Sequence, residues 1–407
     1  MPKASDRRVN PGPWTLNPNI ARVLNSKTGR EADVDWGRPV GLHEGSPVTI
    51  EYDLEAVART GHRGKLEGLW RYAPLLPVTP GPAEYASDVG GTGIARDSRL
   101  SDELDCDVLI KAEGTNPTGS FKDRGLAMGV ALGVACGARR FCLPTQGNAG
   151  VAASCFSARA GLEPALVYMP EGHRGSIYAR QAAHFGADLR FFGANIAASG
   201  KRMRADLSAE LASGAYVDLS TFFEPGRLEG KKTMGLEIAD FFEGAELPAA
   251  ILYPTGGGTG LVGIWKAFGE LRKMGVLAGG RLPAMIAVQS EQCSPVVNAF
   301  DRGLDHVEPV TSGGTVADGL DVPGAIMGHA ILRTLRESEG CAVAVTEDAM
   351  RADFARLGAL GLCANYEGAA TLAALRSLRR TGAVAEGSSV ILLNTSNHVV
   401  GVSATNN

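Results

Sequence analysis

The chain has 407 residues, of which 44% are hydrophobic and 21% are charged, and this size and composition predict a globular protein of two or three domains with a large buried core. The formal net charge of −4 gives no reason to expect nucleic acid or an anionic membrane surface as a partner. The N-terminus has no apolar signal-peptide core, and no stretch reaches the roughly 18–20 apolar residues of a transmembrane helix, so no membrane association is expected.

The first 100 residues are rich in proline, glycine and charge, and their periodicity is weak. They predict an N-terminal arm or a small subdomain joined by loops. A regular alternation begins near residue 107. It predicts strands at 107–114, 139–147, 163–170 and 188–194, and helices at 126–137, 148–161 and 176–187.

The alternation resumes after residue 228 and predicts helices at 229–242 and 261–275, a strand and loop at 249–260, a strand at 284–290, further periodic segments at 330–340 and 367–382, and a last strand at 390–396. The strands are near-continuous apolar runs, which is typical of parallel sheets covered on both faces. The predicted fold class is α/β with two parallel-sheet domains. We expect an N-terminal arm over 1–75, a larger domain from 76–120 and 225–407, and a smaller domain over 121–224.

The seven cysteines stand at positions 106, 136, 142, 155, 293, 341 and 363 and include no C-x-x-C pair. This spacing disfavours both a zinc site and a disulfide framework. We therefore expect a cytoplasmic protein without a bound metal.

Three loops follow predicted strands, where open α/β sheets bind their ligands. They are NPTGSFKDRG (116–125), PTQGNAG (144–150) and PTGGGTG (254–260). A tight strand–helix turn would explain one or two glycines of the third loop, but not the whole run. The pattern is neither a P-loop nor a dinucleotide fingerprint. It predicts a phosphate site in which several backbone N–H groups converge at a helix N-terminus, formed by Gly256, Gly257, Gly258, Thr259 and Gly260.

The other two loops contribute an amine and an amide. Lys122 stands at a loop-to-helix junction and, taken alone, would be interpreted as a solvated charge. Asn148 opens a predicted helix and, taken alone, would be interpreted as an N-cap. Beside a phosphate loop, the two fit a phosphorylated aldehyde cofactor that is contacted on its ring by Asn148 and linked covalently to Lys122. Pyridoxal 5'-phosphate (PLP) has this chemistry.

The segments EGTNPTGSFKDRG, PTQGNAG, RLEGKKTMGLEI and YPTGGGTGLVGIWKAF resemble threonine synthase and its relatives. These are PLP enzymes of fold type II, the tryptophan synthase β type. The resemblance extends from about residue 65 to 396, in the order and spacing of the family. It implies that Lys122 is the catalytic lysine that holds the cofactor, that Asn148 contacts the ring hydroxyl, and that the loop from Gly256 to Gly260, in the larger domain, holds the phosphate.

The resemblance also places the hydroxyl of Thr395 at the pyridine nitrogen. A hydroxyl does not force that nitrogen to be protonated, which tempers electron withdrawal and favours elimination. Arg227 matches an arginine that binds a substrate phosphate, and a forked guanidinium suits that anion. Thr145 and Gln146, in the second loop, are expected on the substrate side.

The chain departs from the family pattern on the substrate side. Val89 replaces an acidic residue in the loop DVGGTGI (88–94), and Gly226 stands where many relatives have an aromatic residue. Ser396, Asn397 and His398 follow Thr395 in place of glycines and a lysine. The segment GSPVTIEYDLEAV resembles the end of a zinc-ribbon module, but no cysteine precedes Cys106, so this subdomain is expected to be degenerate and without zinc.

The resemblance implies a PLP-dependent lyase of amino-acid biosynthesis that converts O-phospho-homoserine and water to threonine and phosphate. Its partners are then a small amino-acid substrate and a second copy in a homodimer. An alternative within the fold is β-replacement on phosphoserine or a related amino acid, as in a cysteate-synthase-like or specialised-metabolism enzyme. A serine/threonine dehydratase is disfavoured because Arg227 would lack a purpose. A catalytically silent homologue is disfavoured because it would not need Lys122.

Overall fold

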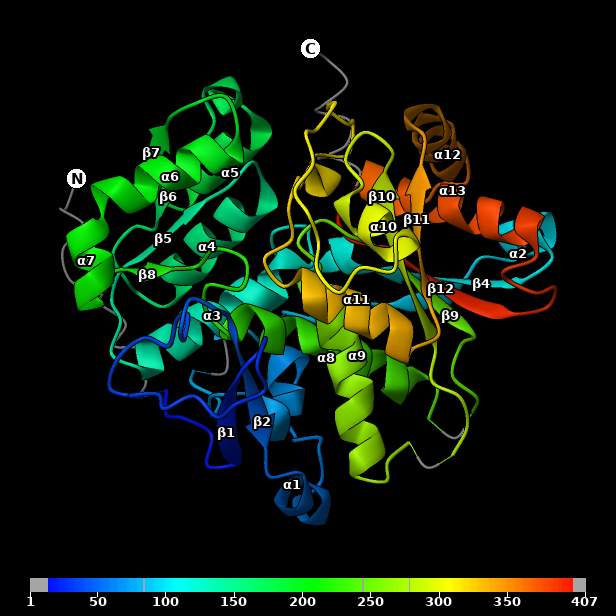
Figure 1. The fold of residues 1–407 in the computed structure, drawn as a ribbon. Helices are drawn as coiled ribbons and strands as arrows, with labels where there is room; N and C mark the ends of the chain where they lie inside the picture. The colour runs from blue at the N-terminus through cyan, green and yellow to red at the C-terminus, as the bar shows by residue number, and fades with distance from the viewer. Residues whose placement is uncertain (1–13, 83–84, 244, 278, 398–407) are drawn as a thin grey trace, which may run out of the picture.

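The computed structural model describes residues 14–82, 85–243, 245–277 and 279–397. Two α/β units lie side by side, with a small N-terminal β-structure below them (Figure 1). The N-terminal part contains the antiparallel strands β1 (Ile20–Asn25) and β2 (Val48–Tyr52), helix α1 (Leu54–Thr60) and the 3-10 helix η1 (Gly68–Leu75). Tyr52 donates a hydrogen bond to Glu229 at 2.9 Å, so this part is fastened to the central helix α8 (Gly226–Phe241).

The larger sheet has six strands in the order β11-β10-β9-β12-β4-β3, parallel except for the antiparallel edge strand β3. Ile391 and Leu393 belong to one hydrophobic cluster, whereas Val390 and Leu392 belong to another. Successive residues of a strand point to opposite faces, so both faces of this sheet are covered and the strands are apolar throughout. The bounds are β3 (Ile94–Arg96), β4 (Asp107–Ala112), β9 (Ala250–Pro254), β10 (Ala284–Ser290), β11 (Cys341–Val345) and β12 (Ser389–Asn394).

The smaller sheet has four parallel strands in the order β7-β6-β5-β8. The strands are β5 (Phe141–Pro144), β6 (Leu166–Met169), β7 (Asp188–Phe191) and β8 (Val217–Asp218), and the helices of this unit are α4 (Asn148–Arg159), α5 (Ile177–His184), α6 (Ile196–Asp206) and α7 (Ser208–Ser213). Both sheets confirm the predicted α/β class with parallel-sheet units.

Helices α3 (Lys122–Ala135), α8 and α9 (Thr259–Lys273) pack against one another in the middle of the molecule (Figure 1). A Cβ on Gly230 would lie 1.9 Å from the carbonyl oxygen of Arg124, so α8 can approach α3 this closely only with glycine there. The other helices of the larger unit are α2 (Ser98–Leu104), α10 (Pro295–Asp301), α11 (Gly328–Glu337), α12 (Glu347–Ala359) and α13 (Tyr366–Thr381).

Two features of the fold go beyond the predicted elements. The region between 195 and 227, to which the sequence pattern assigns no element, contains α6, α7 and β8. Helix α6 buries only Ser199, Gly200 and Met203, so it has no apolar stripe to reveal it. Helices α3 and α8 begin four and three residues earlier than predicted, at Lys122 and Gly226, which places Lys122 and Arg227 in first helical turns.

Candidate active site

The lysine loop, residues 113–121, leads from β4 into α3 and is joined to the segment that follows β12. The backbone N–H of Phe121 donates to the carbonyl oxygen of Thr395 at 3.0 Å, and that of Asn397 donates to Gly119 at 3.1 Å. The two predicted cofactor residues Lys122 and Thr395 are therefore brought to the same place by main-chain hydrogen bonds between segments more than 270 residues apart.

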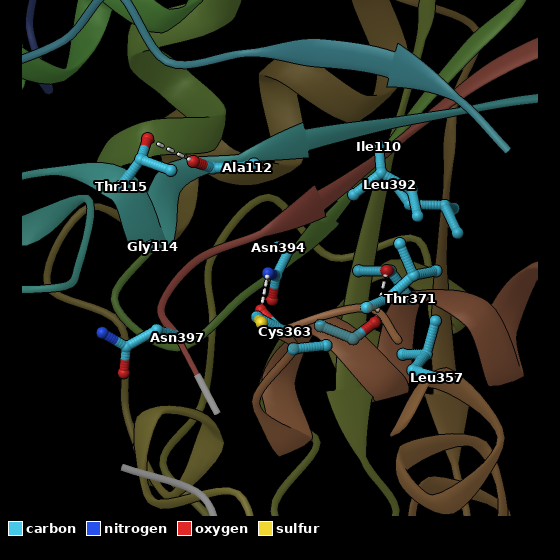
Figure 2. A pocket seen from close by; sticks show the side chains of 13 residues that line it. Ile110, Ala112, Gly114, Thr115, Leu357, Cys363, Thr371, Leu392, Asn394 and Asn397 are labelled. Atoms are coloured by element: carbon cyan, nitrogen blue, oxygen red, sulfur yellow. Dashed lines mark hydrogen bonds between the residues drawn. The ribbon is translucent and has the colours of Figure 1, made fainter. Parts of the chain in front are cut away.

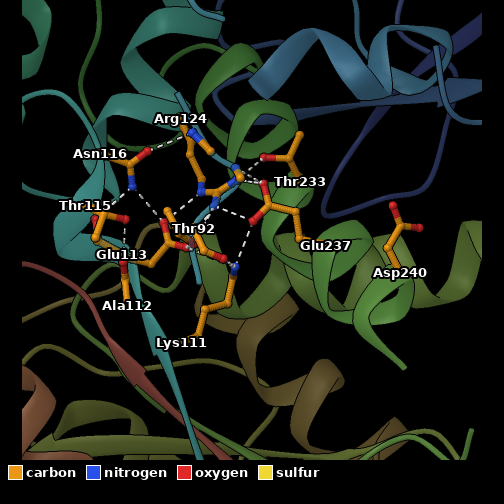
Figure 3. A network of polar contacts seen from close by, with 12 residues as sticks. Thr92, Lys111, Ala112, Glu113, Thr115, Asn116, Arg124, Thr233, Glu237 and Asp240 are labelled. Carbon is orange, nitrogen blue, oxygen red and sulfur yellow. Dashed lines mark hydrogen bonds and ion pairs between the residues drawn. The ribbon is translucent and has the colours of Figure 1, made fainter. Parts of the chain in front are cut away.

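Asp123 and Arg124 explain why the lysine is followed by two opposite charges. The Asp123 carboxylate accepts hydrogen bonds from the backbone N–H and the hydroxyl of Thr118, at 2.7 and 2.5 Å, and so closes the lysine loop on itself. Arg124 donates two hydrogen bonds to Glu113, at 2.7 and 2.8 Å, and two to Glu237, at 2.6 and 2.7 Å (Figure 3). Both flanking residues hold the loop rigidly and leave Lys122 as the free group.

The same buried network fixes the loop DVGGTGI. The Thr92 hydroxyl donates to Glu113 at 2.6 Å and accepts from Lys111 at 2.7 Å (Figure 3). The backbone N–H of Gly91 donates to Glu237 at 2.8 Å. The side chain of Thr92 is therefore engaged in positioning the loop rather than directed to a ligand.

Lys122 is partly buried and lies beside an aromatic ring. Its Nζ is 3.9 Å from the ring centroid of Phe121, and no carboxylate in the described parts of the chain pairs with it. Burial and the positive charge of Arg227 lower the pKa of Lys122 to about 7, although Glu367 opposes the shift. A large part of this amine is therefore neutral near pH 7, as a nucleophile requires.

The glycine loop follows β9 and opens helix α9 at Thr259. Gly258 has a φ of 75°, in the left-handed region that favours glycine. A Cβ at any of the four glycine positions of this loop would approach a neighbouring atom to between 2.1 and 2.9 Å. The backbone is thus packed where side chains are excluded, and the N-terminus of α9 provides N–H groups and a positive dipole end for an anion.

The amide loop follows β5 and opens helix α4 at Asn148. Asn148 Oδ1 is buried and has no hydrogen-bond partner among the described residues. The hydroxyl of Thr145 accepts from the backbone N–H of Gly147 at 3.0 Å, so it shapes the loop, and Gln146 is partly exposed next to it. An acceptor that is buried without a donor is costly, and a ligand hydroxyl or ring group would satisfy it.

Thr395 is buried at the end of β12, and its hydroxyl lies 3.5 Å from Nδ2 of Asn365. Asn365 also donates to Glu367, and Glu367 accepts from the backbone N–H of Gly319 at 2.7 Å. The carbonyl oxygen of Gly319 would be 2.3 Å from a Cβ on Gly256. A continuous set of contacts therefore joins the Thr395 hydroxyl to the glycine loop. His398, by contrast, lies outside the described residues.

Arg227 is 3% exposed, and its Nη1 donates to the carbonyl oxygen of Leu219 at 2.6 Å. Its Nε is buried and lacks a partner in the described chain. The nearby Glu224 accepts from the backbone N–H groups of Gly226 and Arg227 at 2.6 and 2.9 Å, so it caps α8 and does not pair with the guanidinium. Burial lowers the pKa of Arg227 and raises that of Glu224 to about 7.

The sequence analysis did not select Lys231, which lies one turn beyond Arg227 on α8. Lys231 is 2% exposed, and its Nζ donates to the hydroxyl of Thr259 in the glycine loop at 2.5 Å. The spacing of Arg227 and Lys231 could have revealed it, because residues at i and i+4 share a helix face.

Two cavities adjoin the lysine loop. One, of 440 Å³, lies between Gly114–Gly119 and helix α5, where Arg180, Gln181 and His184 line it. The other, of 340 Å³, is mainly apolar and lies between β12 and α13; Figure 2 shows Leu357, Thr371 and Leu392 around it. None of the predicted cofactor residues lines the second cavity, so it is separate from the site of Lys122 and the glycine loop.

Residues 85–396 match the protein family described as pyridoxal-phosphate dependent enzyme. The chain is a member of this family. PLP is therefore its cofactor, and the glycine loop, the unpartnered amide of Asn148 and the neutralised amine of Lys122 fit that molecule: an anion, a ring hydroxyl and an aldehyde.

Curated relatives give a finer comparison. The chain is 31% identical to the threonine synthase of Methanosarcina acetivorans over 354 residues, which cover 86% of this chain and 84% of the relative. It is 29% identical to the threonine synthase of Methanocaldococcus jannaschii over 358 residues, 86% of each chain. The chain is accordingly a threonine-synthase-like PLP-dependent lyase.

Solved structures resemble the fold at lower identity. Maize serine racemase superposes with a TM-score of 0.63 at 17% identity, over 75% of this chain and 88% of the racemase. A fungal L-serine ammonia-lyase from Rhizomucor miehei gives a TM-score of 0.63 at 20% identity, over 77% and 98% of the two chains. These neighbours establish the type II fold. No helix in the described ranges is long and apolar enough to cross a membrane.

Proposed function

We propose that this PLP enzyme converts O-phospho-homoserine and water to threonine and inorganic phosphate. The proposal is supported by the threonine synthase relatives, which cover most of the chain. The single observation that carries it in the structure is the buried guanidinium of Arg227, which has no carboxylate partner among the described residues and retains an unpartnered Nε. Such a group calls for an anion, and a phosphorylated substrate brings one to the cofactor.

Each predicted residue then has a physical role. When bound, PLP supplies the electron sink that stabilises negative charge at carbon. Lys122 holds the cofactor covalently, and its amine, with a pKa lowered to about 7, moves protons to and from Cα, Cβ and Cγ of the substrate. Asn148 donates to or accepts from the ring hydroxyl, and Thr395 places a neutral hydroxyl at the ring nitrogen.

The substrate side is assigned to three residues. Arg227 binds the phosphate of the substrate and holds it in place as the leaving group. Thr145 and Gln146 belong to the loop that opens α4, where Thr145 stabilises the turn and Gln146 reaches the amino-acid part. The side chain of Arg227 is fixed through its hydrogen bond to Leu219, so little conformational entropy is lost when phosphate binds.

We further propose a cytoplasmic homodimer with the domain boundaries given above: an arm over 1–75, a larger domain from 76–120 and 225–407 that contains the glycine loop, and a smaller domain over 121–224. The arrangement of the larger and smaller sheets supports these boundaries, because β3, β4 and β9–β12 share one sheet and β5–β8 share the other.

The substrate assignment is tested by side-by-side assays of phosphate release from O-phospho-homoserine and O-phosphoserine, with threonine measured in the same samples. Release from O-phospho-homoserine should exceed release from O-phosphoserine and should equal threonine formation mole for mole. The reverse ranking, or turnover only when a sulfur or amine nucleophile is added, would establish β-replacement in its place.

A further inference from the structure

Lys231 is a buried lysine without a carboxylate partner in the described structure, and its only hydrogen bond is to the glycine loop. The ammonium group lies 2.5 Å from the Thr259 hydroxyl and 4.6 Å from the ring centroid of Phe121. The same ring contacts Lys122 at 3.9 Å. Two lysines from different helices, α3 and α8, are thus placed around one aromatic side chain.

The adjacent residue shows what a structural lysine looks like at this depth. Lys232 is fully buried and lies 2.7 Å from Glu229 and 2.9 Å from Glu270. A buried ammonium that lacks such carboxylates costs several kcal/mol unless it is neutral. Lys231 therefore cannot be explained as a packing residue that happens to end in an amine.

The surroundings of Lys231 increase this cost. Arg227 precedes it by four residues on the same face of α8, and like charges at this spacing repel. Gly125 of α3 makes room for the side chain, since a Cβ there would lie 3.2 Å from Cε of Lys231. Burial, Arg227 and Lys122 together hold the pKa of Lys231 well below its ordinary value. The fold accommodates a positive charge here in conditions that only an anion would reverse.

We propose that Lys231 is a ligand of the cofactor phosphate and supplies the charge that the neutral glycine loop lacks. The position of its partner favours this phosphate over that of a substrate, because Thr259 lies within the glycine loop and begins α9. Arg227, which bonds to Leu219 instead, remains for the substrate. The inference rests on the PLP cofactor and is independent of which amino acid the enzyme converts.

The test compares Lys231→Gln, which retains a donor for Thr259 but loses the charge, with Lys231→Arg, which retains both. Lys273→Gln is the matched control, because it removes one exposed lysine from the same helix that Thr259 begins. Affinity is measured by titrating PLP into apoprotein and following cofactor absorbance. Losing a charge-assisted hydrogen bond should weaken PLP binding by roughly tenfold to a hundredfold in Lys231→Gln, with most of the affinity kept in Lys231→Arg and all of it in the control.

Two further readouts separate this role from a structural one. The phosphorus NMR signal of bound PLP should stay that of the dianion in the wild type, whereas in Lys231→Gln it should titrate nearer to a phosphate monoester's usual pKa of about 6. Apo Lys231→Gln should unfold at a temperature equal to or above that of the wild-type apoprotein, since it no longer buries a charge. Unchanged PLP affinity with a raised KM for a phosphorylated substrate would assign Lys231 to the substrate phosphate and overturn the proposal. So would a loss of apoprotein stability that accounts for the weaker binding.

Discussion

Replacing Arg227 by lysine keeps the positive charge but removes the fork that binds phosphate. In the structure Nη1 is used for Leu219 at 2.6 Å, whereas Nε is buried without a partner in the described chain. One main-chain bond therefore orients the guanidinium while at least one N–H remains for a ligand. A lysine at this place has a single nitrogen and cannot serve both purposes.

The size of the effect follows from that geometry. A hydrogen bond from a charged donor to phosphate contributes about 1.5–3 kcal/mol, which corresponds to a loss of roughly tenfold to a hundredfold in kcat/KM for O-phospho-homoserine. Arg227→Met, which also removes the charge, should lose more. With serine or O-acetylserine, which have no phosphate, the loss should stay small.

The assay is the initial rate of phosphate or acetate release at several substrate concentrations, with cofactor occupancy checked by absorbance. Arg204→Lys is the matched control: it alters another arginine at the same loop, one that pairs with Asp218 at 3.0 Å, and should leave the ratio between the two substrate types unchanged. An equal loss with phosphorylated and unphosphorylated substrates would refute the reasoning, because Arg227 would then act on the cofactor or the fold.

Three other predictions concern the cofactor and the buried network. Covalent attachment of PLP to apoprotein, trapped by borohydride on the peptide containing Lys122, should accelerate as the pH rises through about 7, because the neutral amine reacts; acceleration only near pH 10, or trapping elsewhere, would contradict the site. Gly258→Ala should lower PLP affinity by roughly tenfold or more, because φ is 75° and the new Cβ would lie 2.3 Å from Ile331, whereas Gly269→Ala, in open space on the same helix, should bind PLP normally. Glu237→Gln should cost about 3–5 kcal/mol of unfolding free energy in urea. Burial opposes ionisation of Glu237, but Arg124 and Lys111 overcome it and lower its pKa to about 2, so the wild type, unlike the variant, should lose this contribution as the pH falls from about 4.5 to 2.

The sequence predicted the parallel sheets because their strands are buried on both faces and so consist of apolar runs. Helix α6 was not predicted because its buried positions are Ser199, Gly200 and Met203, which make no hydrophobic stripe. The glycine loop was predicted from composition alone, since excluded side chains leave a run of glycines. Partner choice has no such signature: nothing in the letters of Thr92 says that its hydroxyl bonds to Glu113 and Lys111.

The roles of neighbouring charges were likewise beyond the sequence. In the run Lys122, Asp123, Arg124, the aspartate folds back onto Thr118 and the arginine reaches Glu113 and Glu237. Only the three-dimensional contacts distinguish the lysine that has no carboxylate from the arginine that has two. Spacing alone made all three equivalent.

Sorting the buried cations by their partners separates scaffold from chemistry in this molecule. One group is paired with carboxylates at 2.5–2.9 Å and comprises Lys111, Arg124, Lys232 and Lys266. The other group has no ion pair within the described ranges and comprises Lys122, Arg227 and Lys231. The second group converges on the glycine loop and on Phe121, and in it burial lowers every pKa. A fold that leaves three cations unpaired in one place, while it pairs the others within a few ångströms, has kept that charge for phosphate: one brought by the cofactor and one by the substrate.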